Sequence, residues 1–373
     1  MAKTGKHGLM TSDSSERERQ IESFLAKQGW DGAQLHPLDQ DASTRRYIRL
    51  TRPDGVKAML MDAPRIEADP CPPYASDQER NRMGWNAQTR LAASRVDAFV
   101  LIAQHLRSLG FAAPEIYAHD TELGFALIED FGERKEIARQ IEAGRVAEQD
   151  AYLAAVDVLV ALHQHPVPDV LSREGERWPI LEFDRLALAT NADLYADWLP
   201  AEAGQDKLSG EMRQRWEAER DALINQAMAF PRTLTLRDFH AENLLWLGDG
   251  RIGLLDFQDA VKGWDAWDMA MLTQDARRDV SPDVAEAAIR RYLDGTGKDR
   301  AAFEERLAVI GALNALRIAG VFSRLQHQDG KPRYGKFQQR QLNVLAKNLQ
   351  HPALQSMAAL VREATPLVFT GLR

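Results

Sequence analysis

Two short apolar runs, at residues 244–247 and 252–255, flank the turn-forming dipeptide Asp249-Gly250. Apolar runs on both sides of Asp-Gly predict a β-hairpin with a tight turn. Such a hairpin brings Asn243, just before the first strand, close to Asp256, just after the second. This hairpin constrains the fold more than any other feature, because it sets two potential metal-binding side chains beside each other.

A further carboxylate, Asp238, lies in the loop that leads to the first of these strands. Carboxylate and amide oxygens hold Mg²⁺ while leaving positions open for water and phosphate, so Asn243 and Asp256 are candidate metal ligands. A separate carboxylate can orient a substrate hydroxyl and accept its proton, which makes Asp238 the candidate catalytic base. The pattern indicates phosphoryl transfer. Surface turns, where Asp is common, would explain one carboxylate but not the order and spacing of all three residues.

Strands and helices are unevenly distributed along the chain. Strand-like runs at residues 47–50 and 58–61 flank the turn signal Pro53-Asp54-Gly55, and further runs follow at 116–118 and 125–128. Later segments mostly show helical periodicity. The sequence therefore predicts an α+β, two-lobed fold, with an antiparallel sheet in a small N-terminal lobe and a larger, mainly helical C-terminal lobe.

We expect the boundary between the lobes at residues 129–132, with an N-terminal lobe over 13–130 and a C-terminal lobe over 131–373. Residues 1–12 show no apolar pattern and are expected to be disordered. The capping-box spacing of Ser15 and Glu18 predicts a first helix over residues 15–28.

Composition limits the classes of function. A hydrophobic fraction of 45% and a charged fraction of 27% are typical of a soluble globular protein. The net charge of −8 argues against nucleic acid as a partner. The one cysteine, Cys71, excludes an intrachain disulfide. No stretch approaches the roughly 18 apolar residues of a membrane span, so we expect a cytoplasmic protein without membrane contact. The sequence does not predict the oligomeric state.

The segment around Asp238 resembles a known catalytic loop. Arg237-Asp238, four intervening residues and Asn243 resemble the protein-kinase signature H-R-D-x-x-x-x-N, and Asp256-Phe257-Gln258 stands where D-F-G would. The wider resemblance covers nearly the whole chain and is to the aminoglycoside phosphotransferase/choline kinase family of small-molecule kinases. In the family loop, H-G-D-x-H-x-x-N, the second His corresponds to His240. The resemblance implies a protein-kinase-like fold, ATP and Mg²⁺ as cofactors, and the same roles for the three polar residues.

The resemblance also implies where the nucleotide binds. Its cofactor-binding residues would be Ser43, Thr44, Arg45 and Arg46 in the loop over the phosphates, and Glu129 and Phe131 in the hinge beside adenine.

Two departures from the family pattern stand out. Leu236 replaces the first His of the loop, so packing must support the loop there. The usual strand lysine is absent, because its position falls near Met61. Lys57, on the same strand face, is expected to be a solvated hairpin residue. Arg45 or Arg46 would then supply the missing positive charge.

Closer resemblance is to the bacterial amino-sugar kinases of cell-wall recycling, carried by residues 236–259, 272–279 and 329–334. Those enzymes phosphorylate the C1 hydroxyl of N-acetylmuramate and N-acetylglucosamine. Arginine suits the lactyl carboxylate of N-acetylmuramate, and Arg277, Arg278, Arg317 and Arg324 fall on predicted helices. The candidate substrate-binding residues are His240, Glu242, Gln258, Asp259, Arg277 and Arg317.

Two alternatives remain open. One is another small-molecule kinase, acting on an aminoglycoside, choline or homoserine. Acidic residues such as Glu242 and Asp259 would suit a cationic acceptor of this kind. The other is a nucleotide-binding regulator without catalysis, which the missing strand lysine suggests.

Overall fold

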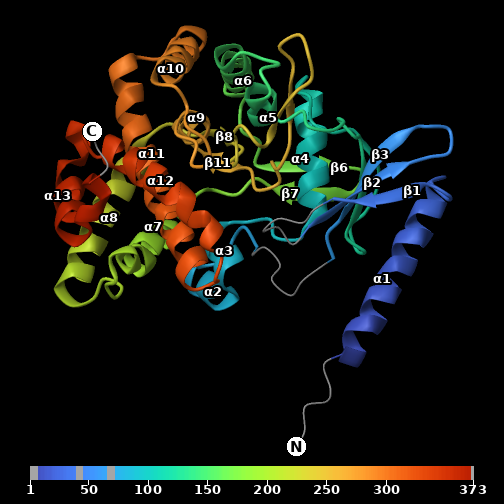
Figure 1. The fold of residues 1–373 in the computed structure, drawn as a ribbon, viewed down its shortest axis with the longest axis horizontal. Helices are drawn as coiled ribbons and strands as arrows, with labels where there is room; N and C mark the ends of the chain where they lie inside the picture. Colours follow the sequence, from blue (N-terminus) through green and yellow to red (C-terminus); the bar gives the residue numbers. More distant parts are fainter. Residues whose placement is uncertain (1–6, 39–44, 65–71, 371–373) are drawn as a thin grey trace, which may run out of the picture.

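The computed structural model describes residues 7–38, 45–64 and 72–370. Figure 1 shows a sheet with helix α1 at one side of the molecule and the C-terminal helices at the other. The sheet-containing part comprises, in order, α1 (His7–Lys27), β1 (Gln34–Pro37), β2 (Arg46–Thr51), β3 (Lys57–Asp62), α2 (Asp77–Met83), α3 (Trp85–Thr89), α4 (Val96–Ser108), β4 (Ile116–Asp120) and β5 (Phe125–Ile128).

The five strands form one antiparallel sheet in the order β1-β2-β3-β5-β4. The predicted turn between β2 and β3 is present, with Gly55 at a φ of 85°. Side chains of β3 point alternately to the two faces of the sheet, and both faces are buried. Ala58 and Leu60 join a cluster with α1, whereas Met59 and Met61 join the main core with α4. The sheet thus lies between α1 and α4, as an α+β architecture requires.

Helix α1 begins at His7, not at Ser15 as the capping box predicted, so residues 7–12 are helical rather than disordered. No proline interrupts this stretch, so nothing prevents the helix from extending upstream. Arg17 of α1 anchors the helix, donating from Nη2 to Oδ1 of the buried Asp62 at 2.6 Å.

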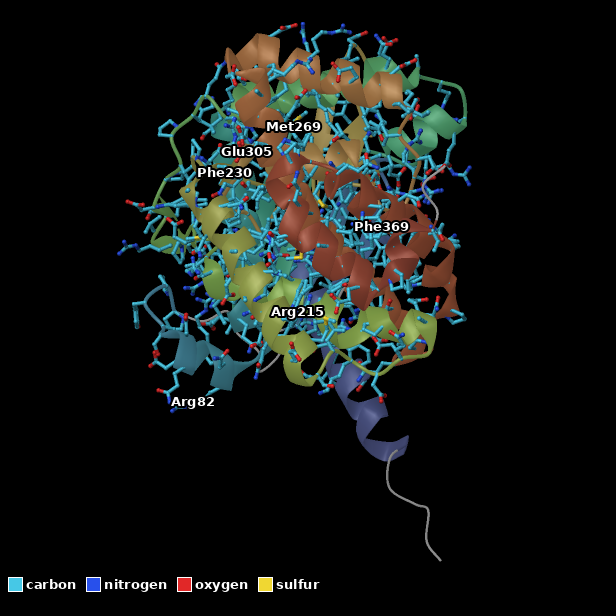
Figure 2. All side chains as sticks on the ribbon, turned by 90° about the vertical axis from the view of Figure 1, so that its left-hand side faces the viewer. Arg82, Arg215, Phe230, Met269, Glu305 and Phe369 are labelled. Carbon is cyan, nitrogen blue, oxygen red and sulfur yellow. The ribbon has the colours of Figure 1, made fainter. Side chains whose placement is uncertain are left out.

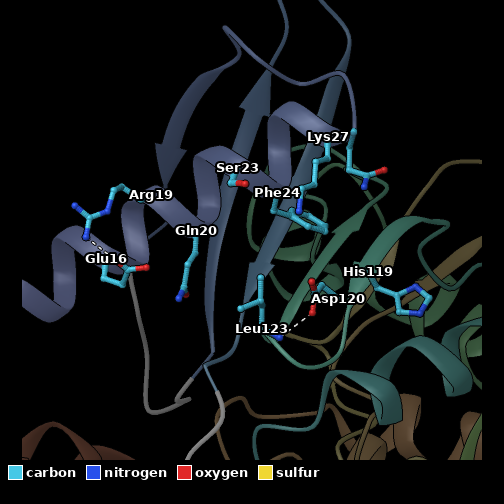
Figure 3. Close-up of a pocket in the computed structure, with 10 residues that line it drawn as sticks. Glu16, Arg19, Gln20, Ser23, Phe24, Lys27, His119, Asp120 and Leu123 are labelled. Atoms are coloured by element: carbon cyan, nitrogen blue, oxygen red, sulfur yellow. Dashed lines mark hydrogen bonds and ion pairs between the residues drawn. The ribbon is translucent and has the colours of Figure 1, made fainter.

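A pocket lies between α1 and the β4–β5 turn (Figure 3). Phe24, His119 and Leu123 help to line it, and none of the residues predicted for the active site does. It is therefore separate from the predicted chemistry.

The chain after β5 is mainly helical. Its elements are α5 (Ile137–Glu142), α6 (Glu148–Leu162), β6 (Val170–Arg173), β7 (Glu176–Pro179), α7 (Arg185–Trp198), η1 (Leu199–Ala203), α8 (Gly210–Ala229), β8 (Thr233–Thr235), β9 (Leu244–Trp246), β10 (Ile252–Leu254), β11 (Val261–Gly263), α9 (Asp265–Thr273), α10 (Pro282–Thr296), α11 (Arg300–His327), η2 (Pro332–Tyr334), α12 (Gly335–Asn348), η3 (Pro352–Leu354), α13 (Gln355–Ala364) and η4 (Pro366–Phe369). Three two-stranded sheets, β6–β7, β8–β11 and β9–β10, interrupt the helices.

Helix α11 runs through the centre of this helical part and contacts α7, α9 and α12. The sequence was expected to contain no stretch long and apolar enough for a membrane span. Helix α11, Arg300–His327, does meet that criterion of length and composition. However, 83% of its most apolar stretch is buried inside the protein. Its apolar character is that of a core helix, which buries its apolar residues against neighbouring helices.

Helix α3 packs against α7, and α2 packs against α3, so this helix pair ties the two parts of the chain together. Arg80 of α2 is the key contact, and only 2% of its side chain is exposed. It donates to both carboxylate oxygens of Asp184, the N-cap residue of α7, at 2.6 and 2.9 Å. Its remaining donors reach the carbonyls of Ala87 and Gln88. The guanidinium is therefore fully used for structure.

Replacing Arg80 should destabilise the protein strongly. Arg80→Met should lower the free energy of unfolding by about 3 kcal/mol, because Asp184 keeps only the longer pair with Arg90 at 3.2 Å and the carbonyls of Ala87 and Gln88 lose this donor. Arg82 is a matched control, since it lies exposed on the same helix and projects from the periphery in Figure 2. Arg82→Met should change stability by less than about 0.5 kcal/mol. Equal urea midpoints for the two variants would contradict this role of Arg80.

Candidate active site

Strands β9 and β10 form the predicted hairpin, with Leu244 opposite Leu254 and Trp246 opposite Ile252. The backbone N–H of Leu255 continues the ladder by donating to the carbonyl of Asn243 at 3.0 Å. As a result Asn243 Nδ2 lies 3.5 Å from Asp256 Oδ2. The convergence predicted from turn chemistry is confirmed.

Asp238 joins this pair through its backbone. Asn243 Nδ2 donates to the Asp238 carbonyl at 2.9 Å, and the His240 N–H donates to the same oxygen at 3.1 Å. The Asn243 amide nitrogen is thus used for structure. No group in the described residues donates to its Oδ1, which is left available as a ligand.

A buried carboxylate on α9 supports the loop before Asp238. Asp268 accepts the N–H of Leu236 at 2.7 Å and that of Arg237 at 2.9 Å. Trp267 Nε1 donates to the Arg237 carbonyl at 3.1 Å. These contacts hold Arg237 at a φ of 75°, a left-handed conformation that costs energy in a non-glycine residue. Leu236, where the family has His, packs in the main core, so Asp268 and packing together support the loop.

Burial raises the pKa of Asp268 to about 7, and its two N–H donors oppose the rise. Asp268→Asn keeps the size but replaces one acceptor with an NH₂ group facing a backbone N–H. We expect kcat to fall about 10- to 100-fold, with a loss of about 1–3 kcal/mol in stability, the cost of an unsatisfied buried donor. Steady-state kinetics and urea unfolding check this result. The exposed Asp283 of α10 provides a control, Asp283→Asn, and matching behaviour of the two variants would rule out the supporting role.

Asp256 lies in a polar cluster. Arg45 Nη2 donates to its Oδ1 at 3.0 Å, and Gln258 Nε2 donates to the same oxygen at 2.9 Å. Although 39% of its side chain is exposed, the surrounding protein desolvates the carboxylate and raises its pKa. Arg45 opposes the rise, while the negative charge of Asp238 adds to it. The site therefore holds more negative charge than one arginine neutralises.

Neighbouring arginines at the start of β2 point in different directions. Arg45 faces Asp256, but Arg46 pairs with Asp62 on the other face of the sheet, so its expected place over the phosphates is wrong. Strand alternation explains the difference, because consecutive side chains lie on opposite faces. Ser43 and Thr44, expected in the same loop, lie outside the described residues.

The strand positions that carry the usual kinase lysine are apolar here. Met61 is fully buried in the core, and Lys57 is exposed at the far end of β3. Arg45 is therefore the cation that the described part of the sheet brings to Asp256. Glu129 and Phe131 follow directly after β5, both half-buried, and the Glu129 N–H donates to the Glu115 carbonyl at 2.9 Å.

Residues expected to bind substrate divide into two groups. Gln258 is 1% exposed and donates to Asp256 and Asp259, so it organises carboxylates and is not placed to contact substrate. Asp259 in turn accepts the Ala92 N–H at 2.6 Å. Its carboxylate anchors the segment before α4, which the sequence did not reveal.

The second group surrounds His240. Burial lowers the pKa of His240 to about 4, so its imidazole is neutral and accepts from Arg277 Nη1 at 2.9 Å. Arg277 also pairs with the exposed Glu242 at 3.2 Å. Arg317, on α11, lies near enough to lower the pKa of His240 further. His240, Glu242, Arg277 and Arg317 are thus gathered near one another, and Arg317 lies near Asp238.

One contact that the sequence did not reveal links the loop that carries Asp238 to α3. Arg237 Nη1 donates to the carbonyls of Thr89 and Arg90, both at 3.1 Å. The helices of this region could have been predicted from the sequence. Ser76 and Glu79 have capping-box spacing, and they form that box at the start of α2.

Solved structures share this fold. A choline/ethanolamine kinase family protein from Mesorhizobium loti matches with a TM-score of 0.55 and 15% identity, over 93% of this chain and 99% of that one. The ADP-bound aminoglycoside phosphotransferase APH(2'')-Ib matches with a TM-score of 0.52 and 14% identity, over 88% of this chain and 98% of that one. The fold is thus the kinase-like fold of small-molecule phosphotransferases.

Sequence comparison defines the family. A model of the phosphotransferase enzyme family matches residues 34–305, and the chain belongs to this family. An N-acetylmuramate/N-acetylglucosamine kinase from Caulobacter vibrioides is 42% identical over 359 residues, covering 95% of this chain and 98% of that protein. A protein of the same name from Pseudomonas aeruginosa is 31% identical over 326 residues, covering 84% of this chain and 83% of that protein. The chain is therefore a kinase that acts on a small molecule.

Proposed function

We propose that this chain transfers the γ-phosphoryl group of ATP to the anomeric hydroxyl of N-acetylmuramate and N-acetylglucosamine, forming the sugar 1-phosphates. The observation that carries the proposal is the 42% identity to the C. vibrioides kinase over 95% of this chain. This similarity includes both the sheet-containing part and the helices around Asp238. Such a reaction would recycle cell-wall amino sugars in the cytoplasm.

Asp238 is the proposed base. Its carboxylate would orient the anomeric hydroxyl and take its proton while the sugar oxygen bonds to the γ-phosphorus. The bond from that phosphorus to the bridging oxygen breaks, and ADP leaves. The Asn243 side chain donates to the Asp238 carbonyl and Asp268 accepts the Arg237 N–H, so the loop backbone that carries the base is held in place before substrate binds.

Asn243 and Asp256 are the proposed Mg²⁺ ligands. The residues fit this ion, because Asn243 Oδ1 is not hydrogen-bonded by the described residues and burial beside Asp238 disfavours the charged form of Asp256. No three His, Cys, Asp or Glu side chains converge as a metal site in the part of the chain that the structure describes. A site with two protein oxygens leaves room for phosphate and water ligands. Mg²⁺ bound there would neutralise charge on the phosphates.

The donor side of the site has further proposed contacts. Arg45 would contact the phosphates in place of the strand lysine, since it already faces the metal ligand Asp256. The backbone of Glu129 to Phe131, directly after β5, would contact adenine. Ser43 and Thr44 belong to the same proposal as members of the loop before β2.

An acceptor panel tests the proposed function. Purified protein is incubated with ATP, Mg²⁺ and each of N-acetylmuramate, N-acetylglucosamine, choline, homoserine and an aminoglycoside, and products are identified by mass spectrometry. We expect phosphorylated N-acetyl sugars and equimolar ADP. Phosphorylation of choline, homoserine or the aminoglycoside alone would reject the acceptor assignment. ATP binding without turnover of any acceptor would favour the non-catalytic regulator.

A further inference from the structure

Four arginines were expected near the acceptor, and the structure separates them by their partners. Arg278 pairs with Glu148 of α6 at 2.8 Å, and Arg277 pairs with Glu242. Arg317 and Arg324 have no carboxylate partner within ion-pair distance among the described residues. Both lie on α11, seven residues apart and so on nearly the same face of the helix.

Neutral groups hold the Arg317 side chain in place. Its Nε and Nη2 both donate to Asn314 Oδ1, at 3.1 and 2.9 Å. Its guanidinium lies 5.6 Å from the ring centre of Trp267, the residue that also binds the Arg237 carbonyl. The Asn314 amide is itself fixed by a contact to Met271 Sδ at 3.1 Å. Arg317 is therefore preorganised without being neutralised.

The charges around Arg317 place it beside the proposed base. Burial lowers the pKa of Arg317 to about 10, and the positive charges of Arg237 and Arg277 lower it further, while Asp238 opposes them. A desolvated guanidinium among like charges is costly unless an anion accompanies it. A carboxylate is the natural complement, because the planar guanidinium can donate two parallel hydrogen bonds to it.

We propose that Arg317 receives the carboxylate of the acceptor sugar and so makes the site favour N-acetylmuramate over the neutral N-acetylglucosamine. This assignment rests on the proposed function and adds a specificity residue to it. The lactyl ether of N-acetylmuramate carries its carboxylate a few bonds from the anomeric carbon. Arg317 lies near both Asp238 and His240, and His240 accepts from Arg277, whereas Arg45 pairs with the proposed metal ligand Asp256.

Arg324 serves as the matched control. It lies on the same face of α11, about 10 Å further along the helix axis at 1.5 Å per residue. Its guanidinium lies 5.9 Å from the ring centre of Trp85. Both arginines are half-buried and lack carboxylate partners in the described part of the chain, so the two variants remove comparable charges.

The experiment measures kcat/KM for both sugars in the wild-type protein, Arg317→Gln, Arg317→Lys and Arg324→Gln. We expect Arg317→Gln to reduce the ratio of kcat/KM for N-acetylmuramate to that for N-acetylglucosamine by about 10- to 100-fold, the range for a lost charged hydrogen bond. Arg317→Lys should recover part of the ratio, because it restores the charge but not the fork geometry. Arg324→Gln should leave the ratio near the wild-type value.

The outcomes separate this inference from the proposed function. If the wild-type protein phosphorylates neither sugar, the proposed function fails. If it phosphorylates both and Arg317→Gln lowers the two kcat/KM values equally, Arg317 only supports Trp267 and the catalytic loop, and the specificity role is wrong. An equal change of ratio in Arg324→Gln would likewise overturn the assignment to Arg317.

Discussion

Asp238→Asn is expected to lower kcat by about two to four orders of magnitude, the range by which general base catalysis accelerates a reaction. The substitution keeps the size of the side chain and leaves the backbone carbonyl that Asn243 and His240 bind. It removes the group that would take the hydroxyl proton. Nucleotide affinity, measured by calorimetry, should change by only about twofold, because the proposed phosphate and metal contacts lie on other residues.

A matched variant controls for the loss of one carboxylate. Asp249→Asn makes the same chemical change at the exposed tip of the neighbouring hairpin, where a φ of 52° also suits asparagine. It should keep the wild-type rate. If Asp238→Asn turned over as fast as Asp249→Asn, Asp238 would not be the base.

Asp256→Ala should affect the metal and nucleotide instead. Losing a charged ligand should weaken Mg²⁺ affinity by more than about 100-fold, since even removing a group that only orients a metal ligand costs 10- to 100-fold. It also leaves Arg45 without the carboxylate at 3.0 Å. Activity titrated against Mg²⁺ at fixed ATP should show a much higher half-saturating concentration and a reduced maximum.

Comparing the two variants tests whether Asp238 and Asp256 have separate roles, one as the base and one as a metal ligand. Asp238→Asn should keep the wild-type Mg²⁺ dependence at its reduced rate, whereas Asp256→Ala should shift that dependence. An unchanged Mg²⁺ titration in Asp256→Ala would show that this carboxylate does not hold the metal.

The central part of the site could be predicted because it depends on short-range rules. An Asp-Gly turn between apolar runs fixes the β9–β10 register, and that register alone brings Asn243 to 3.5 Å from Asp256. Asp268, in the first turn of α9, supports the loop by accepting two of its N–H groups.

Features that depend on distant pairs could not be predicted from the sequence. Asp62 is bound by Arg17, 45 residues away, and Asp184 by Arg80, 104 residues away. Nothing local to either aspartate indicates its partner. The prediction for Arg46 was wrong for the same reason. Which of the two adjacent arginines faces the site depends on how β2 is oriented relative to α1, and this orientation is set by distant contacts.

Short elements were the other source of error. Strands β6, β7 and β11 have only three or four residues each and were not predicted. Tertiary pairing, not local propensity, stabilises strands of this length. The β11–β8 pair nevertheless matters for the site, because β8 leads directly into the loop that carries Asp238.

Cations lie near the Asp238 loop in two groups. Arg45 pairs with Asp256. Arg277 and Arg317 lie near the neutral His240. A kinase that joins an anionic nucleotide to an anionic sugar needs a cation near each of them, and we propose that these two groups supply it.

The position of the new phosphate on the sugar shows whether the protein phosphorylates the anomeric hydroxyl. N-acetylmuramate labelled with ¹³C at C1 is incubated with ATP, Mg²⁺ and the protein, and the product is examined by ¹³C NMR. We expect the C1 signal to be split by coupling to phosphorus, because the anomeric oxygen receives the phosphoryl group. An unsplit C1 signal in a phosphorylated product, or no product at all, would contradict it.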